Sequence, residues 1–129
     1  MSYYFSTTLD DDFDTALGRV RDALKGEGFG VISEIDIRQT LKDKIGADFR
    51  PYVILGACNP TLAHEALQLE DKVGTMLPCN VVVQQAGDGV EVAAIDPVAS
   101  MQAIPNEGLK DKAGQVADKL RRAIVGLDR

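Results

Sequence analysis

Two cysteines and one histidine are the residues of this sequence whose types suit metal or thiol chemistry. Cys58 and His64 lie in the stretch GACNPTLAH at residues 56–64, and Cys79 lies in MLPCNV at residues 76–81. Thiolates bind soft metals such as Cu(I) or Zn, or cycle between a dithiol and a disulfide. Cys58 and Cys79 are therefore candidate thiol-site residues, and together with His64 they form a weak candidate metal set.

The elements around the cysteines decide whether these side chains can meet. The apolar stretch YVILGAC predicts a strand that ends at Cys58, and Asn59 followed by Pro60 predicts a helix start directly after it. A thiol near the positive end of a helix ionises more readily than a free one. If this strand pairs antiparallel with the strand that Cys79 opens, the two cysteines become neighbours.

Three interpretations of the cysteines remain open at this point. The spacing matches no zinc pattern of paired Cys or His ligands, and helix geometry places His64 away from the apolar face centred between Ala63 and Ala66. An exposed His64 is therefore favoured over a ligand. Packing of both cysteines as small apolar residues is favoured over a reactive thiol pair, and a thiol pair is favoured over a permanent metal site.

Apolar residues at three- and four-residue spacing predict two long helices, one after the first strand and one at the end of the chain. The cluster Asp10–Asp12 starts the first helix, and Gly26 and Gly28 end it. The predicted buried residues are Phe13, Ala16, Leu17, Val20 and Leu24 in the first helix, and Leu109, Ala113, Val116, Ala117, Leu120, Ala123, Ile124 and Leu127 in the second.

Five segments have the composition of strands, and short helices lie between some of them. In the second strand, alternation places Val31, Ser33 and Ile35 on one face. Short helices are expected after Asp36, which serves as a cap, and after Asp96-Pro97, and a loop is expected around Gly74. The predicted strands are residues 3–9, 29–36, 50–57 and the hairpin 80–85 with 90–95, which turns at Gly87-Asp88-Gly89.

This order predicts an α+β fold in one domain, residues 1–129, with β-α-β4-α connectivity and a mostly antiparallel sheet. Two long helices with one apolar stripe each can cover only one face of a five-stranded sheet. The third strand is apolar on both of its faces, with Tyr52, Ile54 and Cys58 on one of them. The uncovered face is therefore predicted to be a dimer surface or the floor of a ligand site.

Composition argues against several classes of function. The net charge is −6, which repels a polyanion, and the chain has no Trp for base stacking. No apolar run is long enough to span a bilayer, and no signal-type segment opens the chain, so a cytoplasmic protein with reduced thiols is expected. Neither nucleic acid nor a membrane is expected as a partner, and no residue pattern indicates a reaction.

Several segments resemble the bacterial and archaeal domain-of-unknown-function family numbered 302. The resemblance covers nearly the whole chain and includes RPYVILGACNPTLAHEAL at 50–67, LPCNVVV at 77–83, GFGVISEIDI at 28–37 and the IDP…M segment at 95–101. It implies a sheet curved like the saddle of the TATA-binding protein, and no assigned activity or substrate. The Cys-Asn-Pro and Pro-Cys segments of the family match Cys58, Asn59, Pro60, Pro78 and Cys79.

Two hypotheses for function follow. The first is a non-enzymatic homodimeric binding or assembly module that uses the apolar sheet face to join subunits or to cover a small apolar ligand. The second is a thiol-dependent redox or soft-metal-binding protein that uses Cys58 and Cys79. Candidate ligand-binding or thiol-site residues are Cys58, Asn59, Cys79, Tyr52 and Ile54. No catalytic residue and no cofactor is identified from the sequence.

Overall fold

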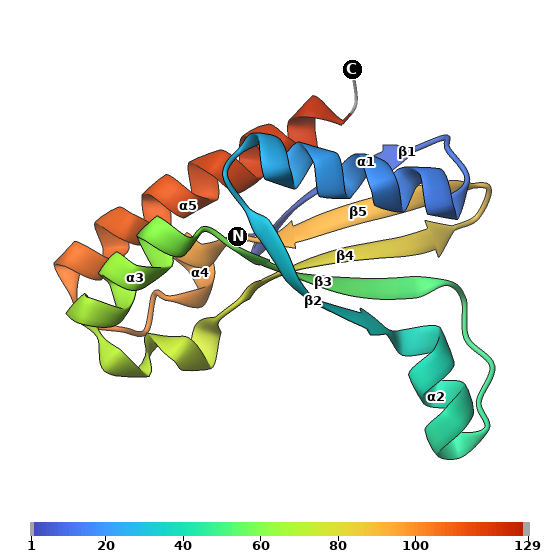
Figure 1. The fold of residues 1–129 in the computed structure, drawn as a ribbon, viewed down its shortest axis with the longest axis horizontal. Coiled ribbons are helices and arrows are strands. Elements are labelled where there is room, and N and C mark those ends of the chain that lie inside the picture. Colours follow the sequence, from blue (N-terminus) through green and yellow to red (C-terminus); the bar gives the residue numbers. More distant parts are fainter. Residues whose placement is uncertain (1, 128–129) are drawn as a thin grey trace.

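One curved antiparallel sheet of five strands forms the centre of the protein (Figure 1). The computed structural model describes residues 2–127. Each strand pairs antiparallel with its neighbours, in the order β1-β5-β4-β3-β2. The strands are β1 (Tyr4–Leu9), β2 (Gly30–Asp36), β3 (Tyr52–Cys58), β4 (Cys79–Ala86) and β5 (Gly89–Ile95).

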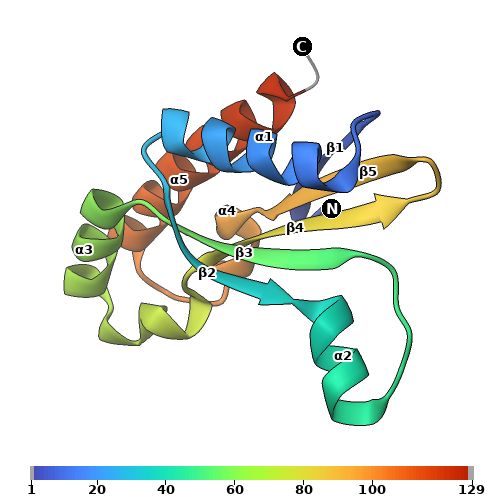
Figure 2. The same cartoon turned by 45° about the vertical axis from the view of Figure 1, so that its right-hand side comes forward.

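Two long helices, α1 (Phe13–Gly26) and α5 (Glu107–Gly126), lie on the same side of this sheet. The shorter α3 (Pro60–Leu69), η1 (Asp71–Met76, a 3-10 helix) and α4 (Pro97–Ser100) gather at one end, and α2 (Ile37–Ile45) lies at the other end (Figure 2). The predicted α+β fold and its β-α-β4-α order are confirmed. Within residues 2–127, no helix has both the length and the apolar character needed to cross a membrane.

The helix starts follow from local side-chain chemistry. Asp12, Asp36 and Asn59 accept hydrogen bonds from backbone N–H groups at the first turns of α1, α2 and α3, as their types predict. Gly46 ends α2 in the left-handed conformation, which glycine adopts without strain. The segment around Gly74 was predicted as a loop; it instead forms the 3-10 helix η1.

The main core lies between the sheet and the two long helices. Leu55 of β3 is fully buried against this layer, and Val53 and Ala57 point the same way. The predicted apolar faces of α1 and α5 supply the opposite side of the core. Fully buried members of the core include Val20 and Leu24 of α1, Leu120 and Ile124 of α5, and Val81, Val83, Val90 and Val92 of the hairpin.

The prediction that Val31, Ser33 and Ile35 share one face of β2 was wrong. Val31 pairs with Ala57, but Ser33 pairs with Gly56, so Ile32 is an extra residue in β2. Such a β-bulge shifts the alternation by one position. Val31 consequently packs against the core, whereas Ser33 and Ile35 lie on the opposite face, beside Gly56 and Ile54.

The face of the sheet opposite α1 and α5 is called the open face. Register places Ile54, Val82 and Ala93 side by side across its three central strands. Polar residues alternate with these apolar ones along the hairpin strands, so the open face is less uniformly apolar than predicted from β3 alone. Its other members include Tyr4, Ile35, Tyr52, Asn80, Gln84, Glu91 and Ile95.

Candidate functional site

The two cysteines lie close together at one end of the sheet. Cys58 ends β3, Cys79 begins β4, and the register places Cys79 opposite Ala57, the residue before Cys58. Both cysteines are free thiols, and both line one small apolar cavity between the sheet, α3 and α5. At about 30 Å³ this cavity is too small for an organic ligand.

Cys58 differs in orientation from the sequence-based expectation. Alternation along β3 grouped it with Tyr52 and Ile54, but it lines the cavity on the helix side of the sheet together with Cys79. Cys58 is the last residue of the strand, and the chain turns there into α3, so the regular alternation no longer fixes its direction. The antiparallel pairing of β3 and β4 on which the expected meeting of the cysteines depended is present, whereas the face that Cys58 takes differs from the expectation.

The surroundings of Cys79 favour its neutral form. Burial in the apolar cavity and, to a smaller extent, the nearby Cys58 together raise the pKa of the Cys79 thiol to about 11. Lys112 lines the same cavity, but its ammonium group forms an ion pair with Glu65. The thiolate is the nucleophilic and metal-binding form of cysteine, so Cys79 is a weak nucleophile at neutral pH.

The other two residues predicted near the cysteines have structural surroundings. The Asn59 side-chain oxygen accepts a hydrogen bond from the Leu62 N–H at 3.2 Å and so caps α3. His64 is exposed on α3, with its Nε2 atom 3.3 Å from the Gln68 amide nitrogen. Among residues 2–127, no three His, Cys, Asp or Glu side chains gather closely enough to hold a metal ion.

We expect Cys79 to resist alkylation in the folded protein. In the variant Cys58→Ser, burial, the larger cause of the shift, still holds the pKa of Cys79 above that of a free cysteine, so the thiolate share at pH 8 stays well below that of a free thiol. Iodoacetamide labelling followed by intact mass measures the rate of alkylation at each pH.

The raised pKa of Cys79 also makes stability depend on pH. Because the Cys79 thiol loses its proton at a lower pH in the unfolded chain than in the folded one, the folded protein should lose stability as the pH rises from about 9 to about 11.

Rapid labelling of Cys79 at pH 8 in conditions that keep the Cys58→Ser variant folded would contradict this prediction. The unfolded variant in urea is the internal control, since its single cysteine must label at the rate of a free thiol.

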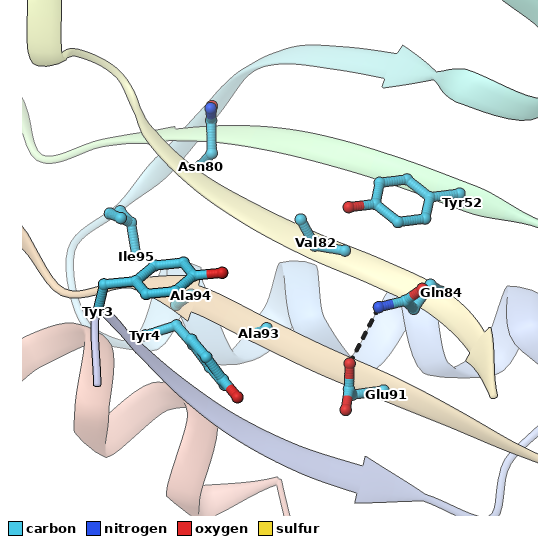
Figure 3. A pocket seen from close by; sticks show the side chains of 10 residues that line it. All are labelled: Tyr3, Tyr4, Tyr52, Asn80, Val82, Gln84, Glu91, Ala93, Ala94 and Ile95. Carbon is cyan, nitrogen blue, oxygen red and sulfur yellow. Dashed lines mark hydrogen bonds between the residues drawn. The ribbon is translucent and has the colours of Figure 1, made fainter. Parts of the chain in front are cut away.

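A hollow of about 360 Å³ lies on the open face and is the larger candidate site (Figure 3). Tyr3 and Tyr4 stand on one side of it and Tyr52 on the other, with Val82 and Ala93 on the floor between them. This size falls in the range of small-molecule sites, which combine apolar walls with a few polar groups. The polar groups here are Asn80, Gln84 and Glu91, and Ile95 completes the floor.

A chain of hydrogen bonds orders the polar side of this hollow. Arg50 Nε donates to Gln84 Oε1 at 2.9 Å, and Gln84 Nε2 donates to Glu91 Oε1 at 3.0 Å. The Arg50 guanidinium also stacks on Phe49, with 4.4 Å between its carbon and the ring centre. Gln84 is thereby held in one orientation, and one oxygen of Glu91 has a fixed donor.

The sequence singled out two residues of the open face and missed most of the hollow. Tyr52 lines the hollow, and Ile54 lies beside it as the register partner of Val82 on the floor. Tyr3, Tyr4, Gln84 and Glu91 were not predicted. The two-residue alternation of the hairpin strands, combined with the register that pairs Gln84 with Glu91, could have placed the last two residues on this face.

Three exposed isoleucines lie away from the hollow, on the edge strand β2 and on the helix α2 that follows it. Ile32 and Ile35 on β2 are 65% and 46% exposed, and Ile45 at the end of α2 is 72% exposed. We call these three residues the β2–α2 surface. None of the residues of α2 is buried, although Ile37 and Leu41 are half-buried. The helix projects from the end of the sheet (Figure 2), and Ile45 at its end is the most exposed of its apolar residues.

Comparisons with known proteins give a family and a fold. A family model described as "Domain of unknown function DUF302" matches residues 5–127. The crystal structure of an uncharacterized conserved protein DUF302 from Bacillus stearothermophilus is similar, with a TM-score of 0.90 and 28% sequence identity. The match covers 97% of this chain and 98% of that chain. The curated proteins contain no match.

Proposed function

Because the chain belongs to the DUF302 family, which is a family of unknown function, we propose a function from its surfaces: a non-enzymatic, homodimeric binding module that uses its open sheet face. One observation carries this proposal. The helices cover one face of the sheet, and the other face has a hollow of about 360 Å³ toward β1 and the exposed Ile35 at its β2 edge. Apolar surface left exposed in this arrangement is typical of a contact or binding site.

The β2–α2 surface is the part of the open face best suited to a second copy of the chain. Ile37, Leu41 and Ile45 recur at four-residue spacing along α2, yet none of them is buried. A helix of nine residues is marginal by itself and normally gains its stability from packing of its apolar side. A second copy, related by a twofold axis, would cover the apolar side of α2 and the exposed outer edge of β2.

We expect the substitutions Ile45→Glu and Ile35→Glu each to weaken self-association at least tenfold. A twofold interface contains each substituted position twice, and a glutamate placed between apolar surfaces loses hydration without gaining a partner. Sedimentation equilibrium of the two variants and the unmodified protein measures the dissociation constant.

Val125→Glu is the matched control for this experiment. Val125 lies on α5 and is 47% exposed, almost the same as Ile35 at 46%, but it is far from the β2–α2 surface. Its substitution should leave self-association unchanged. A monomeric unmodified protein at high concentration, or equal effects of Val125→Glu and Ile45→Glu, would refute the proposed dimer surface.

The hollow is the proposed binding site of the module. It lies toward β1, β5 and β4, whereas the β2–α2 surface lies at the opposite edge of the sheet, so both can be used at once. Val82, Ala93 and Ile95 give the hollow an apolar floor, which supports binding of the apolar part of a small molecule.

A thiol-dependent role for Cys58 and Cys79 is the second candidate function. Its support is that both side chains line one cavity and that Cys58 affects the titration of Cys79. Oxidised glutathione would take two electrons and two protons from the pair and form a disulfide, which lowers the intact mass by two hydrogen atoms. An unchanged mass would argue against this candidate and leave the binding module unaffected.

A further inference from the structure

All three tyrosines of the chain line the hollow on the open face, although they come from two separate parts of the sequence. The rings of Tyr3 and Tyr4 form an edge-to-face pair, with centres 5.0 Å apart and planes at 72°. Tyr52 faces them across the floor (Figure 3). Aromatic rings gathered around one space attract cations, because the face of each ring carries partial negative charge.

Glu91 is the single charged residue among those that line the hollow. Its carboxylate is half-buried, and one oxygen accepts a hydrogen bond from Gln84. None of the ion pairs among residues 2–127 involves Glu91. Its second oxygen is therefore available to a positively charged group in the hollow.

The charges around the hollow favour a cationic occupant over an anionic one. The nearest basic group on the hydrogen-bond chain is Arg50, which contacts Gln84, Phe49 and the Tyr52 ring and does not line the hollow. The protein as a whole carries a net charge of −6, which attracts cations and repels anions.

We propose that this hollow binds a small organic cation, with its ammonium group beside Glu91 and its apolar body on Val82 and Ala93 between the tyrosines. The inference rests on the binding role proposed above and names its ligand class. A hollow of about 360 Å³ accommodates a single small molecule of this kind. The ammonium group would form a charge-assisted hydrogen bond with Glu91 and cation–π contacts with the tyrosine rings. Burial of the apolar body on the floor would remove its apolar surface from water.

Intrinsic tyrosine fluorescence tests this proposal directly. The chain has no Trp, and its three tyrosines all line the hollow, so the emission reports on this site. The probes are phenethylammonium, 2-phenylethanol and phenylacetate, which are similar in size and differ in charge. We expect phenethylammonium to bind at least tenfold more tightly than 2-phenylethanol, and phenylacetate to bind most weakly.

Glu91→Gln should remove the preference for the cation and leave binding of 2-phenylethanol unchanged. Glu107→Gln is the control, because it changes the net charge equally but lies on α5 outside the hollow. Equal affinities of phenethylammonium and 2-phenylethanol, or an unaltered preference in Glu91→Gln, would overturn the cation inference and leave a binding hollow standing. Absence of saturable binding by all three probes would overturn the binding role of the hollow as well.

Discussion

Replacement of Leu55 by alanine lowers the free energy of unfolding by about 3 kcal/mol, the expected cost for a buried leucine that leaves a cavity. Leu55 lies at the centre of β3, is 0% exposed, and belongs to the core between the sheet and the two long helices. Interiors of proteins are close-packed, so the surrounding residues fill the lost volume only in part. Urea denaturation of the purified variant measures the loss.

Ile54 is the matched control, since it is the adjacent residue on the same strand and points to the open face. It is half-buried, so Ile54→Ala should cost less than about 1 kcal/mol in the monomer. Both variants are compared at protein concentrations below those that support self-association, because association stabilises the folded state by mass action. Equal losses at Ile54 and Leu55 would mean that Ile54 is packed as fully as Leu55, and therefore that the open face is covered in the monomer.

Short-range chemistry explains why much of the fold could be predicted from the sequence. The apolar stripe of α5 and the caps Asp12, Asp36 and Asn59 act within a few residues of chain, and each was found where predicted. The hairpin is defined equally locally, by two alternating strands and the glycine turn at Gly87. Such features depend on one element at a time, so the sequence pattern alone identifies them.

Long-range geometry explains what the sequence could not reveal. The bulge at Ile32 follows from how β2 pairs with β3, and it places Val31 and Ser33 on opposite faces of the sheet instead of on the same face. The hollow brings Tyr3 together with Tyr52 and Glu91 only after the sheet order β1-β5-β4-β3 has been established. The composition of α2 predicted a helix, but a residue pattern cannot show that the rest of the fold buries none of its residues.

Gly56→Ala should lower the free energy of unfolding by about 2 kcal/mol, although it adds only one methyl group. Gly56 is buried on the open face, and a Cβ atom there would lie 2.1 Å from Ser33 Oγ and 2.8 Å from Pro78 Cγ. The Ser33 hydroxyl can rotate away, whereas the Pro78 ring can yield only if the backbone at the start of β4 moves. Thermal and urea unfolding of the variant measure the cost.

Gly114→Ala provides the opposite result as a control for Gly56→Ala. Gly114 lies inside α5, and no neighbouring atom lies within 4 Å of the place that an alanine Cβ would take, so alanine should stabilise the protein by about 0.5 to 1 kcal/mol. The double variant Ser33→Ala, Gly56→Ala separates the two contacts, because it removes the hydroxyl and retains the proline ring. Only partial recovery is expected. Full recovery would show that Ser33 alone restricts Gly56, and that Pro78 can move without disturbing the start of β4, where Cys79 and Asn80 begin the strand.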